Sequence, residues 1–398
     1  MLLNFGEIPR PNWIEIDLDN LQSNIAFTRS LLPKKTKILL PVKADAYGHG
    51  SLAISLAAIE AGVDFLGVAH LFEGVALREN GIKARILILG PCLESDLPIL
   101  IKHNLTPSIQ DFETANCLSQ KCKDFQNNSK FKIHIQIDTG MHRFGIDCEN
   151  AIEVKKICEL PNLEAEGIYS HLATADMQGH PAMDVQLSRF GKLIAFLEKE
   201  GMRPPICHIA NSPATFLFSK THYDMVRPGI ALYGYDPVGK FPSDFPIKPV
   251  LRLRSTVRAI REVAEGEGIS YGHFFVANKN MRVATIAIGY GDGYLRGEPS
   301  TGMIFVRGRP CPILGRVCMD ACMIDASGVA DMQIGDIAEC INGEFSEHIS
   351  VEAFAREHST ISYEITTRMA QRLYRLYKYK GETTGWNQLM NTAFRLQP

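Results

Sequence analysis

Several residues able to do covalent or acid–base chemistry follow short apolar runs of the sequence. Lys43 ends the run ILLPVK, His171 ends GIYSH and Arg227 ends DMVR, while Asp138 and Arg143 follow FKIHIQI. Burial lowers the pKa of a lysine, and the neutral amine is then a nucleophile toward a carbonyl carbon. Lys43 is therefore a candidate Schiff-base lysine.

Two later segments have the composition of a phosphate-binding site. Asn211 and Ser212 precede a proline and can cap a helix, and Arg227 is followed by Pro228 and Gly229. Backbone N–H groups at a helix start bind phosphate oxygens. A reactive lysine combined with a phosphate pocket favours pyridoxal phosphate as the cofactor.

Each of these residues also has an ordinary structural explanation. A lysine is usually solvated, a buried histidine is usually hydrogen-bonded, and a serine after an asparagine often caps a helix. What favours a function is their shared position at the ends of apolar runs. In a barrel of parallel strands these ends form the catalytic face, and the loops after the last two strands often hold a phosphate.

The elements that position these residues alternate between two kinds of segment. Between Thr36 and Gly234, eight apolar runs are separated by amphipathic stretches typical of helices. The eight runs are 36–45, 64–70, 84–90, 105–110, 131–138, 163–172, 206–212 and 223–228. Eight such units predict a (β/α)8 barrel of the TIM type, with a doubly wound open sheet as the alternative.

Beyond Gly234 the sequence changes character. A connector with four prolines leads into alternating runs at 250–263, 282–294, 302–308 and 309–325, which predict a mostly antiparallel β domain. We expect one helix near Val351–Glu357, and we interpret the basic aromatic tail, 368–380, as a solvated or interface helix rather than an RNA-binding patch. The expected domains are 12–245 and 246–398, with residues 1–11 associated with the second.

Composition excludes several classes of protein. The 398 residues contain 42 lysines and arginines against 44 acidic residues, and the net charge of −2 argues against binding to nucleic acid or an anionic membrane. Ten scattered cysteines without a Cys-x-x-Cys pair favour free thiols in a reducing compartment. Cys318 and Cys322 alone do not make a metal site. Because neither a signal peptide nor a membrane span is recognisable, we expect a cytoplasmic protein.

Nine motifs, spread from about residue 11 to residue 364, resemble the alanine racemase family. They are VKADAYGHG (42–50), IDTGMHRFG (137–145), GIYSHLATAD (167–176), HIANSPAT (208–215), MVRPGIALYG (225–234), GISYGHFF (268–275), IAIGYGDGY (286–294), ILGRVCMD (313–320) and ISYE (361–364). The resemblance implies a pyridoxal-phosphate isomerase with a barrel and a β domain. It also implies a head-to-tail homodimer with shared active sites.

The resemblance identifies two bases. Lys43 is similar to the lysine that forms the aldimine with the cofactor and acts on one face of the substrate. Tyr271 is similar to the tyrosine that the partner subunit supplies on the opposite face. Two bases are needed because inversion removes a proton on one face and delivers one on the other. A tyrosine, whose ordinary pKa is about 10, then requires nearby positive charge.

The resemblance implies roles for the remaining candidates. Arg227 faces the pyridine nitrogen, with His171 behind it, and Arg143 and the backbone of Met319 contact the substrate carboxylate. The other cofactor-binding residues are Tyr47, Asn211, Ser212, Gly229, Ile230 and Tyr363, and the residues at the entrance to the site are Tyr290 and Asp320.

Three features depart from the family pattern. Gln136 stands where many members have a carbamylated lysine, and we expect its amide to hold Arg143 instead. His142 replaces a small residue, usually glycine, and His273 follows the tyrosine motif. The tail after Glu364 lacks the usual cysteine and the Arg-Val-Pro-Arg ending.

The leading hypothesis is interconversion of L- and D-alanine, supplying D-alanine for peptidoglycan. A serine racemase or one of broader specificity is the alternative within the fold, and a non-catalytic pyridoxal-phosphate-binding protein is the alternative of another class. A decarboxylase on the same barrel is disfavoured because the chain has no run of three glycines.

Overall fold

A closed barrel forms the first domain. The computed structural model describes residues 11–123, 130–239, 241–242 and 245–387, so the expectation for residues 1–10 lies outside the described residues. The barrel strands are β2 (Lys37–Pro41), β3 (Phe65–Val68), β4 (Arg85–Pro91), β5 (Thr106–Ile109), β6 (Phe131–Asp138), β8 (Leu163–Tyr169), β9 (Ile206–His208) and β10 (Met225–Val226). All pair in parallel, and pairing of β5 with β6 closes the ring. The predicted TIM-type barrel is confirmed.

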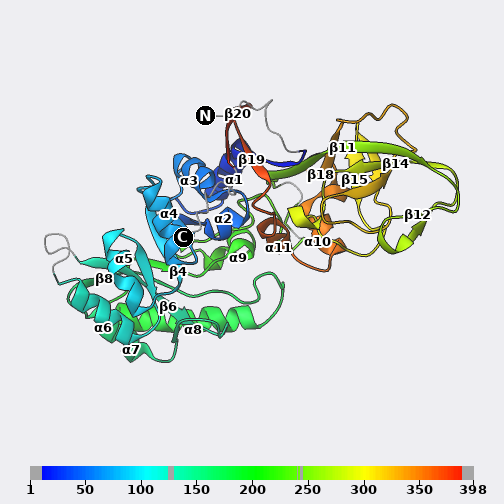
Figure 1. Ribbon diagram of the computed structural model, residues 1–398. Coiled ribbons are helices and arrows are strands. Elements are labelled where there is room, and N and C mark those ends of the chain that lie inside the picture. The colour runs from blue at the N-terminus through cyan, green and yellow to red at the C-terminus, as the bar shows by residue number, and fades with distance from the viewer. Residues whose placement is uncertain (1–10, 124–129, 240, 243–244, 388–398) are drawn as a thin grey trace.

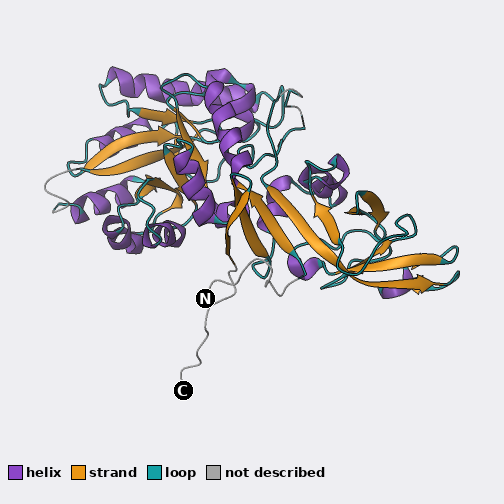
Figure 2. Cartoon of the chain, turned by 90° about the horizontal axis from the view of Figure 1, so that it is seen from above, coloured by secondary structure: helices purple, strands orange, loops and turns teal. Residues whose placement is uncertain are grey.

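Helices surround this barrel, as Figure 2 shows. They are α1 (Leu18–Ser30), α3 (Ser51–Glu60), α4 (Leu71–Glu79), α5 (Leu97–Lys102), α6 (Phe112–Lys121), α7 (Ala151–Cys158), α8 (Ala182–Lys199) and α9 (Ser212–Leu217). The short element α2 (Lys43–Tyr47) is a turn with left-handed backbone angles. A two-residue strand, β7 (Ile146–Asp147), extends from β6. Within the described residues no helix is both long and apolar enough to cross a membrane.

The second domain is built on a twisted, mostly antiparallel sheet (Figure 1). Its strands are β11 (Leu251–Val263), β14 (Met281–Ile286), β15 (Met303–Val306), β16 (Arg309–Pro312), β17 (Cys322–Asp325), β18 (Ile337–Ile341), β19 (Tyr374–Tyr379) and β20 (Glu382–Asn387). Strands β12 (Gly268–Ile269) and β13 (Phe275–Val276) form a separate two-stranded sheet. Two short helices, α10 (Val351–Glu357) and α11 (Ser362–Thr367), pack against it. The predicted β domain is confirmed, as is the helix near Val351.

Both ends of the described chain meet in this sheet. The first strand, β1 (Trp13–Asp17), pairs antiparallel with β11 and parallel with β19, so it lies in the sheet of the second domain. The predicted helix over 368–380 is wrong, because this segment contains strand β19, paired with β1 and β20. Its helical spacing is overridden by pairing with a strand about 360 positions earlier in the sequence, which no local pattern reveals.

Apolar and polar layers alternate inside the barrel. Leu39, Phe65, Leu87, Ile206 and Met225 form a buried cluster to which five strands each contribute one residue. Contacts between strands that are not neighbours are possible only in the interior of the ring, so this cluster fills it. A buried polar layer of histidines lies beside the cluster.

Glu166, on β8, closes this polar layer with several cations. It is nearly buried and pairs with Arg85 and with Lys132 at 2.9 Å, and its carboxylate lies 3.8 Å from His134 Nε2. Burial raises the pKa of Glu166, but interaction with His134, Lys132 and Arg85 outweighs burial and lowers the pKa to about 2. The carboxylate is therefore a stabilising group whenever it is ionised.

Replacing Glu166 with glutamine is expected to lower the stability of the folded chain by about 2 kcal/mol at neutral pH, because a neutral amide replaces the buried carboxylate that accepts charge-assisted bonds from the partly exposed Arg85 and Lys132. The ordinary pKa of 4.5 falls on folding, so the contribution is complete above pH 4.5 and is lost as the pH falls toward 2. Thermal melts across this range test both points. Glu200→Gln, which breaks the exposed pair with Lys155, is the control, and equal effects of the two variants would contradict the prediction.

Candidate active site

Lys43 begins a tight turn directly after β2, at the mouth of the barrel. The four residues that follow it all have φ between +50° and +54°, a left-handed turn that costs about 1 kcal/mol per residue. Burial lowers the pKa of Lys43, and the nearby charges of Arg143 and Arg227 lower it further, while Glu73 opposes them. The amine is therefore easier to deprotonate than an ordinary lysine.

Arg227 follows β10 and is buried beneath this face of the barrel. Its Nη1 bonds His208 Nδ1 at 2.8 Å, and its Nη2 donates to the Ser170 carbonyl at 2.7 Å and lies 3.1 Å from His171 Nδ1. Burial lowers the pKa of Arg227 to about 10, so the guanidinium remains a cation at neutral pH. These bonds fix it in one orientation.

The hydrogen bonds of Arg227 also set the protons of two buried histidines. An arginine only donates, so His208 Nδ1 accepts, and His208 Nε2–H donates to His134 Nδ1 at 2.9 Å. His134 then presents its remaining N–H toward Glu166. Burial and Arg227 lower the pKa values of both histidines, which keeps them neutral in this order. Sequence reasoning did not assign His208, although it opens one of the quoted motifs.

A second cluster at the barrel mouth has the form of a cradle for an anion. Ser212 Oγ accepts the N–H of Gly229 at 2.8 Å and of Ala231 at 3.3 Å. A Cβ at Gly229 would lie only 2.8 Å from the Tyr47 hydroxyl, so glycine is required there. Tyr363, from α11, packs on Tyr47, with ring centroids 5.8 Å apart.

The other predicted members of this cluster are structural neighbours. Asn211 caps α9 by accepting the N–H of Ala214, and its amide donates to the Leu172 carbonyl at 3.2 Å. Ile230 is fully buried behind the cradle. Burial raises the pKa of Tyr363 to about 12, against a bond from Ser212 that lowers it, so its hydroxyl stays protonated and able to donate.

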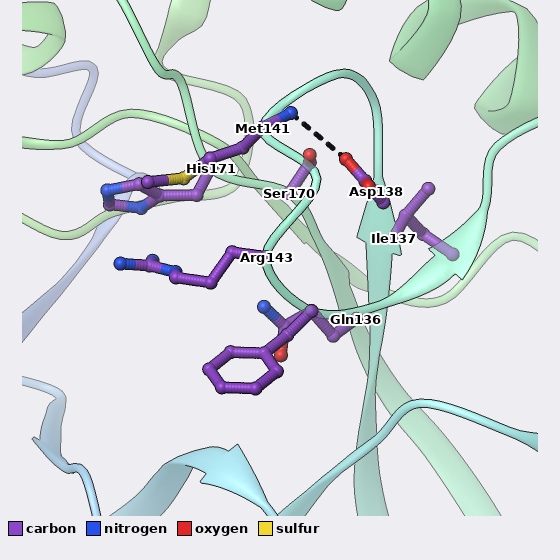
Figure 3. A pocket seen from close by; sticks show the side chains of 8 residues that line it. Gln136, Ile137, Asp138, Met141, Arg143, Ser170 and His171 are labelled. Carbon is purple, nitrogen blue, oxygen red and sulfur yellow. Dashed lines mark hydrogen bonds between the residues drawn. The ribbon is translucent and has the colours of Figure 1, made fainter.

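Arg143 lies on the loop after β6 and points toward His171 (Figure 3). Asp138 shapes this loop, because its Oδ1 accepts the N–H groups of Gly140, Met141 and His142. The side chain of Arg143 lines a small hollow together with Gln136 and His171.

The expectation that Gln136 holds Arg143 is not met among the described residues. The Oε1 of Gln136 accepts from Gln110 Nε2 and from Tyr169 Oη, both at 3.0 Å. Its amide oxygen is therefore already engaged inside the barrel. His142, beside Arg143, has φ +55° and reaches Asp138 Oδ2 at 3.1 Å, so the histidine adds to the bonds that hold the loop.

The remaining candidates gather on the second domain. Tyr290 donates its N–H to the Cys318 carbonyl at 3.1 Å, and the Met319 carbonyl accepts the N–H of Gly291. Ser270, next to Tyr271, donates to the Arg316 carbonyl at 2.6 Å. These contacts join the segments that carry Tyr271, Tyr290, Met319 and Asp320.

This second group is exposed. Tyr271 is 69% exposed, Met319 53% and Tyr290 42%, and Asp320 pairs with Arg372 at 2.7 Å. Strand β12, which precedes Tyr271, lies at the far end of the second domain from α2 in Figure 1. The chain therefore brings together the barrel residues and Tyr363, but not the group that includes Tyr271. Three positions after Tyr271, the Phe274 ring centroid lies 3.9 Å from the Arg316 guanidinium.

The residues at the barrel mouth fit pyridoxal phosphate. A carbonyl-reactive cofactor needs an amine that deprotonates readily, which the partly buried Lys43 provides. Its phosphate needs convergent hydroxyl donors beside a backbone without a Cβ. The hydroxyls of Ser212, Tyr47 and Tyr363 gather at Gly229, which has no side chain to obstruct them. Arg227 supplies a fixed cation near Lys43, whose pKa it helps to lower.

Comparison with known families agrees with both domains. Residues 16–237 match the family described as "Alanine racemase, N-terminal domain", and residues 250–377 match "Alanine racemase, C-terminal domain". The chain is 40% identical over 374 residues to an alanine racemase of Halothermothrix orenii, covering 94% of this chain and 98% of the relative. It is 36% identical over 373 residues to one of Methanococcus maripaludis, covering 93% and 99%.

Solved structures show the same architecture. The alanine racemase of Clostridium difficile 630 superposes with a TM-score of 0.90 at 31% identity, covering 96% of this chain and all of the other. The alanine racemase of Bacillus anthracis with bound L-Ala-P superposes with a TM-score of 0.86 at 34% identity, covering 96% and 98%.

Proposed function

Because this chain belongs to the alanine racemase family, we propose that Lys43 and Tyr271 are the two bases of its reaction, the interconversion of L-alanine and D-alanine. The observation that carries the proposal is the position of Lys43. Its amine lies among Arg143, Arg227 and Glu73, beside a cradle built for an anion. No other lysine of the described chain combines a lowered pKa with such surroundings.

Pyridoxal phosphate, when bound, supplies the electron sink that makes the Cα–H bond of an amino acid acidic. Lys43 Nζ holds or moves the proton on one face of Cα. Burial and two nearby arginines lower the pKa of Lys43, which favours the neutral amine, the form that can accept this proton. The Tyr271 hydroxyl holds or moves the proton on the opposite face.

Arg227 places a positive charge at the cofactor's ring. Its bonds to His208 and Ser170 keep a cation fixed where the resemblance places the pyridine nitrogen. A fixed guanidinium disfavours protonation of that nitrogen, which limits charge build-up on the cofactor and thereby side reactions such as transamination. His171, neutral because burial and Arg227 lower its pKa, supports the guanidinium.

Substrate binding and access use residues from both groups. We assign Arg143 to the substrate carboxylate, for which a planar guanidinium is geometrically suited, with help from the backbone of Met319. Tyr290 and Asp320 line the entrance. The barrel group and the Tyr271 group lie apart in one chain, so we propose a head-to-tail homodimer in which each site takes residues from both subunits.

Two further assignments complete the proposal. The ten cysteines are all free thiols, which supports a reducing compartment such as the cytoplasm. D-alanine made there is a building block of peptidoglycan.

We propose that the domains divide at 12–245 and 246–398. Strand β1, which belongs to the first of these ranges, pairs with β11 and so connects the first domain to the sheet of the second.

Incubating the chain with pyridoxal phosphate and either enantiomer of alanine in D₂O is expected to give both inversion and exchange of the α-proton. The reason is that a two-base site removes the α-proton from either enantiomer and exchanges it with solvent. Chiral chromatography and NMR measure the two processes. L-serine and larger amino acids in the same assay distinguish the alanine reaction from a broader specificity, and cofactor binding without exchange would identify a non-catalytic binding protein.

A further inference from the structure

The turn that carries Lys43 is held in place by contacts from outside it. Ala44, Asp45, Ala46 and Tyr47 form a left-handed turn that is rarely stable by itself, since only glycine adopts this conformation readily. Lys43 stands at one end of the turn and Tyr47, a member of the anion cradle, at the other. Whatever holds the turn therefore sets both positions.

Two barrel residues hold the two ends of the turn. Glu73, on α4, accepts the N–H of Ala44 at 2.7 Å and also caps its own helix through the N–H groups of Ala69 and His70. His49 is fully buried and lies 3.0 and 2.9 Å from the carbonyls of Ala46 and Tyr47. Because carbonyls only accept, His49 Nδ1 carries the proton.

The third contact comes from the second domain. Arg375 lies on β19 and is 2% exposed, although it is one of the largest polar side chains. Its Nε donates to the Gly48 carbonyl at 2.8 Å and lies 3.7 Å from Asp45 Oδ2. Its two terminal nitrogens also donate: Nη1 to the Leu373 carbonyl at 3.4 Å and Nη2 to the Met369 carbonyl at 3.3 Å.

The end of the turn also packs closely against Thr366 of the second domain. A Cβ at Gly48, where φ is +82°, would lie 2.0 Å from the Thr366 carbonyl oxygen of the second domain. Asp45 Oδ1 meanwhile accepts the N–H of Ser51 at 2.8 Å, which leaves Oδ2 facing Arg375. The guanidinium thus connects the last strand of the second domain to the end of the Lys43 turn.

We propose that Arg375 is a positioning residue for racemisation: by binding the Gly48 carbonyl and Asp45 from β19, it holds the left-handed turn that sets Lys43 and Tyr47. The inference rests on the proposed function in taking Lys43 as a base and Tyr47 as a cofactor ligand. It assigns the tail of the chain a part in the active site, although Arg375 contacts neither substrate nor cofactor.

The chemistry of the contact requires a guanidinium. Three carbonyls and a carboxylate surround one buried cation, and the donors must fan out in a plane to reach them. Lysine keeps the charge but places its donors on one atom, so Arg375→Lys keeps only part of the contact. Arg375→Met keeps the volume and removes every donor.

The test compares Arg375→Met and Arg375→Lys with the wild type and with Arg254→Met. Arg254 is the matched control because it lies in the same sheet, on β11, and pairs with Glu15 and Glu339 without touching the turn. The first measurement is amide hydrogen exchange of residues 44–50 in the protein without cofactor. This segment reports on the turn because the N–H groups of Ala46, Gly48 and Gly50 donate to carbonyls within the turn or next to it.

We expect Arg375→Met to speed exchange in this turn by about 10-fold while other barrel segments keep their wild-type rates. In the loaded enzyme, kcat should fall about 100-fold with KM for alanine within about threefold, since a misplacement of about 1 Å has that effect. The dissociation constant of pyridoxal phosphate should rise, because Tyr47 moves with the turn. For Arg375→Lys, the exchange rates, kcat and the dissociation constant should lie between those of the wild type and those of Arg375→Met. Arg254→Met should leave the exchange rates of the turn unchanged.

Unchanged exchange in residues 44–50 of Arg375→Met overturns the inference. The inference is also overturned if exchange in Arg375→Met is faster across the whole barrel, and no faster in residues 44–50 than in Arg254→Met, because that result indicates general destabilisation. If Arg375→Met does not fold, Arg375→Lys decides by the same measurement. A wild-type chain without racemase activity overturns the proposed function instead, and the exchange experiment still shows whether Arg375 holds the turn.

Discussion

Replacing Lys43 with alanine is expected to lower kcat/KM for alanine racemisation by about 10⁴-fold or more, in both directions. One amine is assigned both the attachment of the cofactor and the proton on one face of Cα, and each role alone is worth orders of magnitude. The lowered pKa of Lys43 favours the neutral amine that both roles require. Formation of each enantiomer, followed by chiral chromatography, measures the loss.

The control is Lys220→Ala, which removes an exposed lysine paired with Asp184 on the outside of the barrel and should leave the rate unchanged. Adding a small primary amine to Lys43→Ala should restore part of the activity, because free amine can take over the proton transfer. If Lys43→Ala retains activity within about tenfold of the wild type, the base on this face is another residue.

The barrel was predictable because its signals are local. Each of the eight predicted runs overlaps one barrel strand, and the run 131–138 coincides with β6. A buried parallel strand is a short continuous apolar run, and the helix that must follow it repeats the signal. Candidate residues at the strand ends, such as Lys43 and Arg227, follow directly from that pattern.

What local signals miss are contacts between distant segments. The helical spacing of apolar residues in the tail predicts a helix, yet Tyr374 to Lys378 pair with β1 at the other end of the described chain. The link from Arg375 to Gly48 spans 327 positions. Glu73 and His208 were missed for the same reason, since each looks like an ordinary helix or strand residue until its partners are known.

The separation of the two groups of site residues has one economical explanation. The barrel group has an amine, a fixed cation and an anion cradle, and the second domain carries the exposed Tyr271. Large exposed side chains on a folded domain are typical of an interface. Tyr271, Phe274 and Met319 are all more than half exposed, so this face of the second domain is the expected contact with a second copy.

Tyr271→Ala alone is expected to lower racemisation by about 10²- to 10⁴-fold, the usual contribution of one acid–base group. Mixing Lys43→Ala chains with Tyr271→Ala chains is then expected to restore activity. In a symmetric dimer of shared sites, one site of each mixed dimer contains both mutations and the other contains neither. Random exchange makes about half of the dimers mixed, so activity should recover to about a quarter of the wild-type value.

The mixing experiment needs proof that subunits exchange, which differently tagged chains purified in sequence provide. A mixture of Lys43→Ala with Lys43→Ala,Tyr271→Ala chains is the matched control, because every site in it lacks Lys43 and no recovery is possible. Proven exchange without recovery would mean that Tyr271 acts within its own chain or not at all. Recovery near a quarter places Lys43 and Tyr271 of different chains in one site. Tyr271 is then exposed in a single subunit because the partner subunit covers it only in the dimer.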